Sequence, residues 1–242
     1  MIFGRKKAHE AAKPSPEAQV RAEPDQPVEA AKDLPGIPAE LQETWREWDA
    51  EASREEGPFD ITEVDLEADD VNRLDLGSII VTPFQQMNLQ LQVDKERTRV
   101  QAILVGDGSS MIEVALFGAP AKSSIIPEIR RDIIASTAKS KGRVAVVKGP
   151  FGGEIRRALP VTDPQGKSAL HVSRTWLVEG PSWMLRGVLM GKAAMEPADL
   201  DASLTLYEFF ANLVVRRGHA PVAPGALIAM TMPTQETPTR GA

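Results

Sequence analysis

The spacing of hydrophobic and polar positions changes along the chain. Between residues 11 and about 57 large hydrophobic residues have no regular spacing, and Ala, Glu and Pro dominate. Beyond residue 75 hydrophobic and polar residues mostly alternate, which is the repeat of a β-strand with one buried face. Two segments, 124–141 and 199–216, instead space them by three and four residues, as amphipathic helices do. The pattern therefore predicts a disordered tail followed by strands and two helices.

The predicted strands come in consecutive runs that the helices interrupt. They cover residues 77–81, 88–94, 100–105, 111–117, 143–147, 155–161, 170–178, 183–190 and 226–232. Consecutive strands favour antiparallel pairing, because parallel neighbours need a long crossover between them. We therefore predict an α+β fold in which an antiparallel β-sheet carries two main helices. It forms one domain over 77–232, with an acidic linker at 58–76 and a frayed end at 233–242.

The predicted tail, residues 1–57, contains one segment with regular spacing. Leu41, Trp45 and Trp48 are separated by four and three residues, so they share one face of a short helix. Such a face is typical of a segment that binds a partner protein. Docking of this helix on its own domain fits the pattern equally well.

Charge is distributed unevenly over the 242 residues, whose net charge is −6. Residues 1–76 carry 9 basic and 20 acidic residues, whereas residues 77–242 carry 19 and 14. An acidic tail commonly serves solubility, and screening of a basic surface is the alternative. The basic residues that could form such an anion-binding surface lie on or after the first predicted helix. They are Arg130, Arg131, Lys139, Lys141, Arg143 and Lys148.

Candidate catalytic residues are sparse. The absence of Cys excludes disulfides and thiolate chemistry. The three histidines are His9, His171 and His219. They are too far apart in sequence to form a metal pair on one element, and no nucleotide-binding or hydrolase motif is found. We therefore predict no catalytic, cofactor-binding or metal-binding residues.

Several charged residues lie inside the predicted sheet, where a charge must be either solvated or paired with an opposite charge. Glu113, Glu154 and Glu179 lie near predicted strand ends, where solvated carboxylates are common. Arg174 is in line with apolar residues of its strand, so its charge needs a carboxylate partner or a bound anion. Pairing with a carboxylate is the commoner outcome.

The segment 176–188 resembles the signature hairpin of an actinobacterial family catalogued as domain of unknown function 3710. The residues that carry the resemblance are Trp176, Gly180, Pro181, Trp183, Leu185, Arg186 and Gly187. Shorter pieces at 4–7, 57–60, 73–78, 117–120 and 214–218 match in the same order. The resemblance implies no assigned activity and no catalytic residue. The order of elements is also similar to the PsbP-like α/β/α sandwich, a fold used mainly by non-catalytic binding and assembly proteins.

These observations favour a cytoplasmic, non-enzymatic protein-binding or assembly adaptor without a cofactor. An anion-binding or nucleic-acid-associated protein that uses the basic residues is the first alternative, and an unrecognised hydrolase is the second. We expect no membrane association, because no apolar run approaches the roughly 18 residues of a membrane span. A secretory signal is not expected either, because charge follows Phe3 almost at once.

Overall fold

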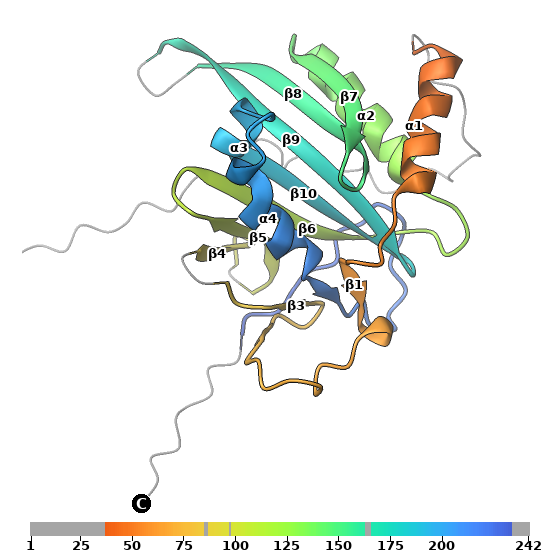
Figure 1. The fold of residues 1–242 in the computed structure, drawn as a ribbon, viewed down its shortest axis with the longest axis vertical. Coiled ribbons are helices and arrows are strands. Elements are labelled where there is room, and N and C mark those ends of the chain that lie inside the picture. Colours follow the sequence, from red (N-terminus) through yellow and green to blue (C-terminus); the bar gives the residue numbers. More distant parts are fainter. Residues whose placement is uncertain (1–36, 85–86, 97, 163–165, 234–242) are drawn as a thin grey trace, which may run out of the picture.

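A seven-stranded antiparallel sheet with helices on both faces forms the body of the protein (Figure 1). The computed structural model describes residues 37–84, 87–96, 98–162 and 166–233. Of the predicted tail, residues 1–36 lie outside the described part, as does the chain end beyond residue 233. The predicted α+β class is confirmed.

The order of the main sheet explains how the chain closes on itself. Its strands, in spatial order, are β4 (Asn88–Val93), β5 (Val100–Gly106), β6 (Ser110–Gly118), β10 (Trp183–Gly191), β9 (Ser168–Gly180), β8 (Gly152–Thr162) and β7 (Arg143–Gly149). Every neighbouring pair is antiparallel. The chain leaves the sheet after β6, returns at the β7 edge and runs back through three hairpins. β10 then pairs with β6, so a non-local contact joins the two halves.

A second, smaller sheet lies beside the first. Its order is β1 (Phe59–Asp60), β11 (Val214–Val215), β3 (Ile79–Val81) and β2 (Leu74–Asp75). A short 3₁₀ helix, η2 (Ile61–Glu63), follows β1. The segment predicted as a linker thus supplies two short strands and a 3₁₀ turn.

The helices match the sequence prediction only in part. They are α1 (Ala39–Glu51), α2 (Ile126–Lys139), the single turn α3 (Lys192–Met195) and α4 (Asp201–Ala211). The prediction that the last helix reaches Arg216 was wrong, because Val214 and Val215 pair with β3 as strand β11. The strand predicted over 226–232 is reduced to two isolated bridges, at Leu227 and Met230.

Each face of the main sheet has its own hydrophobic cluster. On the α4 face Trp176, Phe151 and Phe210 pack with ring centroids 5.2–5.7 Å apart. On the α2 face Ile126 and Ile133 belong to the smaller cluster with residues of the strands. No helix among the described residues is long and apolar enough to cross a membrane.

Buried charges connect the strands on the α4 face. As predicted, Arg174 meets a carboxylate: its Nε and Nη2 donate to the two carboxyl oxygens of Glu154 at 2.9 and 2.8 Å. Trp176 Nε1 donates to the same carboxylate at 2.7 Å. Glu113 and Glu154 are each only 2% exposed, so the expectation that they are solvated was wrong. Neighbouring strands and side chains cover them.

Candidate functional site

Helix α1 docks on the domain where β7 turns into β8. Asp49 is its anchor, because Oδ1 accepts hydrogen bonds from Arg130 Nη2 at 2.7 Å and from the backbone N–H of Gly153 at 2.9 Å. The adjacent Gly152 permits this approach: a Cβ there would lie 2.8 Å from Asp49 Oδ1 and 3.0 Å from its Cα. Glycine at the turn is therefore a steric requirement for docking.

Two of the residues singled out in the sequence bind each other. Trp45 is buried, and the guanidinium carbon of Arg130 lies 5.7 Å from the centroid of its ring. The prediction that Arg130 belongs to an exposed basic face was wrong, since its side chain is 3% exposed and paired with Asp49. Trp48 is half-buried, and Leu41 is exposed.

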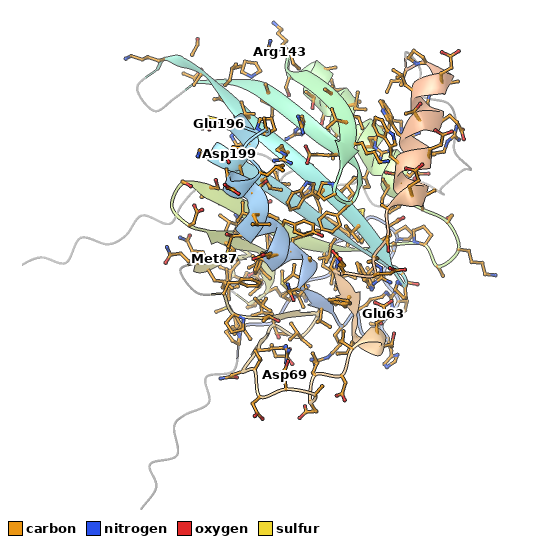
Figure 2. All side chains as sticks on the ribbon, viewed as in Figure 1. Glu63, Asp69, Met87, Arg143, Glu196 and Asp199 are labelled. Carbon is orange, nitrogen blue, oxygen red and sulfur yellow. The ribbon has the colours of Figure 1, made fainter. Side chains whose placement is uncertain are left out.

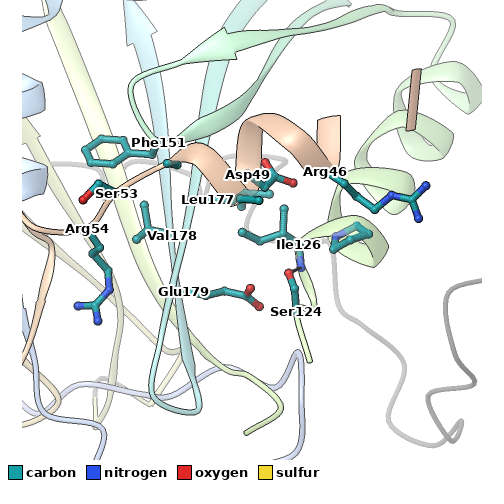
Figure 3. A pocket seen from close by; sticks show the side chains of 13 residues that line it. Arg46, Asp49, Ser53, Arg54, Ser124, Ile126, Phe151, Leu177, Val178 and Glu179 are labelled. Atoms are coloured by element: carbon teal, nitrogen blue, oxygen red, sulfur yellow. Dashed lines mark hydrogen bonds between the residues drawn. The ribbon is translucent and has the colours of Figure 1, made fainter. Parts of the chain in front are cut away.

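A cavity of about 350 Å³ lies between α1, the start of α2 and β9, and we call it the α1 cavity (Figure 3). Its lining residues are Arg46, Asp49, Ala50, Ala52, Ser53, Arg54, Ser124, Ile126, Pro127, Phe151, Leu177, Val178 and Glu179. Most of the wall is apolar, and a few polar groups interrupt it. Both its size and this composition are typical of sites that bind a small group.

Among the described residues, Glu179 supplies one of the two carboxyl groups that line the α1 cavity, and Asp49 supplies the other. Oε1 of Glu179 accepts a hydrogen bond from the backbone N–H of Ile125 at 2.7 Å, and Figure 3 shows the Glu179 carboxylate beside Ser124. Burial raises the pKa of Glu179 above its ordinary value, and the hydrogen bonds from Ser124 and Ile125 offset only part of this effect. The nearby carboxylates of Asp49 and Glu128 raise the pKa further.

The arginines of the cavity wall are engaged elsewhere. Arg54 donates to both carboxyl oxygens of Glu63 and to the carbonyl of Pro58. Arg46 pairs with Glu43 of its own helix. In addition, Oε2 of Glu128 is buried and has no hydrogen-bond partner among the described residues. The α1 cavity thus combines an apolar wall with a carboxyl group that no cation in the described part of the chain neutralises.

The other residues predicted to bind anions do not gather into one compact site. Arg131 lies 3.7 Å from Asp132, and Nζ of Lys148 donates to Glu51 at 2.7 Å. Lys139, Lys141 and Arg143 are exposed where α2 ends and β7 begins, and Figure 2 shows Arg143 at the top of the view.

The signature hairpin consists of β9 and β10, and its residues serve packing. A Cβ on Gly180 would lie 2.1 Å from the ring of Trp183, and one on Gly187 would lie 2.8 Å from Phe210. Trp183 Nε1 donates to the buried Asp60 at 2.8 Å. The guanidinium of Arg186 lies over the ring of Phe117, at 5.2 Å. In the same hairpin Trp176 and Leu185 are buried, whereas Pro181 at the turn is exposed.

Sequence reasoning missed the two carboxylates that define the site. Asp49 was one of many acidic residues in the predicted tail, and Glu179 was expected to be solvated at a strand end. No local pattern distinguishes either residue, because the cavity forms only when α1, α2 and β9 come together. The two tryptophans of α1 were the only signal that pointed to this region.

Comparisons with known proteins give a family and no function. The family model described as "Protein of unknown function (DUF3710)" matches residues 57–239, which include the main sheet but not α1. Comparison with curated proteins gives no match. A solved structure from Bacteroides thetaiotaomicron aligns with 60% of this chain at 12% sequence identity, with a TM-score of 0.36. The chain spans about half of that structure's chain, 49%, and a likeness this weak supports no inference.

Proposed function

Because the chain belongs to the DUF3710 family, whose description assigns no function, we propose a role from its own geometry. The protein is a non-enzymatic, cytoplasmic protein-binding module, and its partner inserts a cationic side chain into the α1 cavity. The observation that carries this proposal is the half-buried carboxyl of Glu179 in the wall of the α1 cavity. Burial raises its pKa, and no cation among the described residues offsets this effect.

A cation is the ligand that this environment favours. Burial and the neighbouring carboxylates disfavour the ionised form of Glu179, so a cation that enters the cavity would relieve an existing electrostatic cost. Lysine and arginine also carry apolar stems, which would cover the wall formed by residues such as Ile126 and Leu177. A basic side chain on the surface of a partner protein fits both the wall and the carboxyl group.

The polar groups around the cavity support binding over catalysis. Asp49 accepts hydrogen bonds from Arg130 and Gly153, which anchor α1 on the domain. Ser124 contacts Glu179, but none of the described residues that line the cavity is His or Lys. A nucleophile of the usual serine type needs such a base and a third group that orients it.

Nuclear magnetic resonance with a capped lysine, N-acetyl-lysine methylamide, tests the proposal on the full chain. The amide of Ile125 is the reporter, because it donates to Glu179. We expect a saturable shift of this amide in the wild-type protein. In Glu179→Gln the affinity should fall at least about tenfold, which corresponds to roughly 1.4 kcal/mol.

Glu96→Gln is the matched control. Glu96 is an exposed carboxylate near β4, at the opposite edge of the main sheet from β7. Its removal changes the net charge equally, so the affinity for the capped lysine should stay at the wild-type value. Equal affinity in Glu179→Gln and in the wild-type protein would overturn the proposed function.

A further inference from the structure

A second cavity of about 350 Å³ adjoins the α1 cavity. The two share Ala52, Ser53 and Phe151 in their walls. The second cavity lies between the connector after α1, the β7–β8 turn and α4, and we call it the connector cavity. Glu179 does not line it, so its chemistry is independent of the function proposed above.

Aromatic rings form part of the connector cavity. Phe151 and Tyr207 stack with ring centroids 5.3 Å apart and an interplanar angle of 23°. Trp48, from α1, lines the same cavity and is half-buried. These rings come from three separate elements, so the docking of α1 brings the aromatic wall together.

Carboxylates provide the charge of the connector cavity. The described residues that line it include Glu51, Glu55 and Glu56, against the single cation Lys148. Lys148 pairs with Glu51 at 2.7 Å, and both side chains are about 60% exposed. The hydroxyl of Tyr207 lies 3.4 Å from Glu56, and burial together with this carboxylate raises the pKa of Tyr207. The lining therefore has an excess of negative charge next to aromatic rings.

We infer that the connector cavity is a second binding site, for an organic cation of the guanidinium or alkylated ammonium class. Such cations are weakly hydrated and are attracted to aromatic faces, whereas small inorganic cations keep their water. The excess carboxylates add attraction at the same place. The site stands whether or not the α1 cavity takes a lysine.

The indole N–H resonance of Trp48 in the ¹⁵N-labelled full chain tests this inference. The variant Trp48→Phe lacks this resonance and thereby identifies it. The other tryptophans are less accessible to a ligand, because the indoles of Trp176 and Trp183 donate to buried carboxylates and Trp45 is buried. Titration uses methylguanidinium, tetramethylammonium and, at equal ionic strength, potassium chloride. We expect saturable shifts with the two organic cations and none with potassium chloride. The organic cation that binds with the higher affinity shows which head group the site prefers.

Four variants separate this site from its alternatives. Tyr207→Leu should weaken binding of the organic cations about fivefold, whereas Tyr207→Phe, which keeps the ring, should retain it. Glu56→Gln removes an exposed negative charge but keeps an oxygen that can accept from the Tyr207 hydroxyl, so it provides the test if Tyr207→Leu does not fold. We expect about threefold weaker binding. Glu179→Gln should bind like the wild type. A shift of equal size with potassium chloride, or wild-type affinity in both Tyr207→Leu and Glu56→Gln, would overturn the inference.

Discussion

Glu154 and Glu179, on neighbouring strands, show how hydrogen-bonding arginines determine the pKa of a buried carboxyl. Burial alone would raise the pKa of Glu154, but hydrogen bonds from Arg174 and Arg156 outweigh it and hold the pKa below its ordinary value. Burial also raises the pKa of Glu179, and none of the residues that the structure describes offers a cation to offset it. The first carboxyl is therefore a structural ion pair, and the second has the electrostatic character of a binding group.

Stability as a function of pH tests this reading of Glu179. A carboxyl whose pKa is higher in the folded than in the unfolded state favours folding below its unfolded pKa of about 4.5. That contribution is lost as the pH rises through the folded pKa. We expect Glu179→Gln to be more stable than the wild type at pH 8 by up to about 1 kcal/mol. The difference should shrink towards pH 5.

Urea unfolding of both proteins between pH 5 and pH 8 measures this difference. Glu96→Gln again serves as the control, because an exposed carboxylate should leave the curve unchanged. A difference between Glu179→Gln and the wild type that stays constant with pH would contradict a raised pKa at this position.

Individual residues also show which contacts can be predicted from the sequence and which cannot. The alternation of its strand places Arg174 among apolar residues, which is enough to predict a carboxylate partner. The state of Glu179 could not be predicted, because α1 and the start of α2 create its environment and both are distant in sequence. Arg130 shows the same limit: helical spacing places it on α2, but its buried pair with Asp49 exists only where α1 docks.

Among the elements, α1 is the one whose docking determines both cavities. Its existence follows from the spacing of Trp45 and Trp48, whereas its position depends on Asp49 and on the glycines of the β7–β8 turn. Without Asp49, Arg130 would remain buried and unpaired, at a cost of roughly 3 kcal/mol if α1 stayed in place. Detachment of the helix is the cheaper response.

Hydrogen exchange of the Asp49→Ala variant tests the docking of α1. We expect the amides of α1 to lose at least about tenfold in protection, because a detached helix of 13 residues is marginal in water. Protection of β9 and β10 in the main sheet should stay unchanged. Glu47→Ala, an exposed substitution on the same helix, is the matched control. Unchanged protection of α1 in Asp49→Ala would show that this contact does not hold the helix.

The end of α4 illustrates an ambiguity of periodic patterns. Val214 and Val215 extend an apolar segment whose spacing is compatible with a longer helix. They are buried as strand β11 because β3 offers backbone partners at Ile79 and Ile80. A short apolar run is equally suitable for a buried strand or a helix, and only the tertiary neighbour decides between them.

In the molecule as a whole, local signals predicted the class of the fold and long-range pairing completed it. Turns rich in Gly and Pro indicated the hairpins from β7 to β10, and these are present. The pairing of β10 with β6 carries no local signal, although it joins the two halves of the main sheet. The two cavities, likewise, lie at the junction of α1 with the rest of the protein.

The pKa of the Glu179 side chain, followed by ¹³C nuclear magnetic resonance with and without N-acetyl-lysine methylamide, tests the central claim most directly. A cation that binds beside this carboxyl must favour its ionised form. In the free protein we expect a pKa above the ordinary glutamate value, and at saturation with the capped lysine we expect a clearly lower one. A pKa that is ordinary in the free protein, or that does not change at saturation, would contradict the claim that the α1 cavity recognises a cation through Glu179.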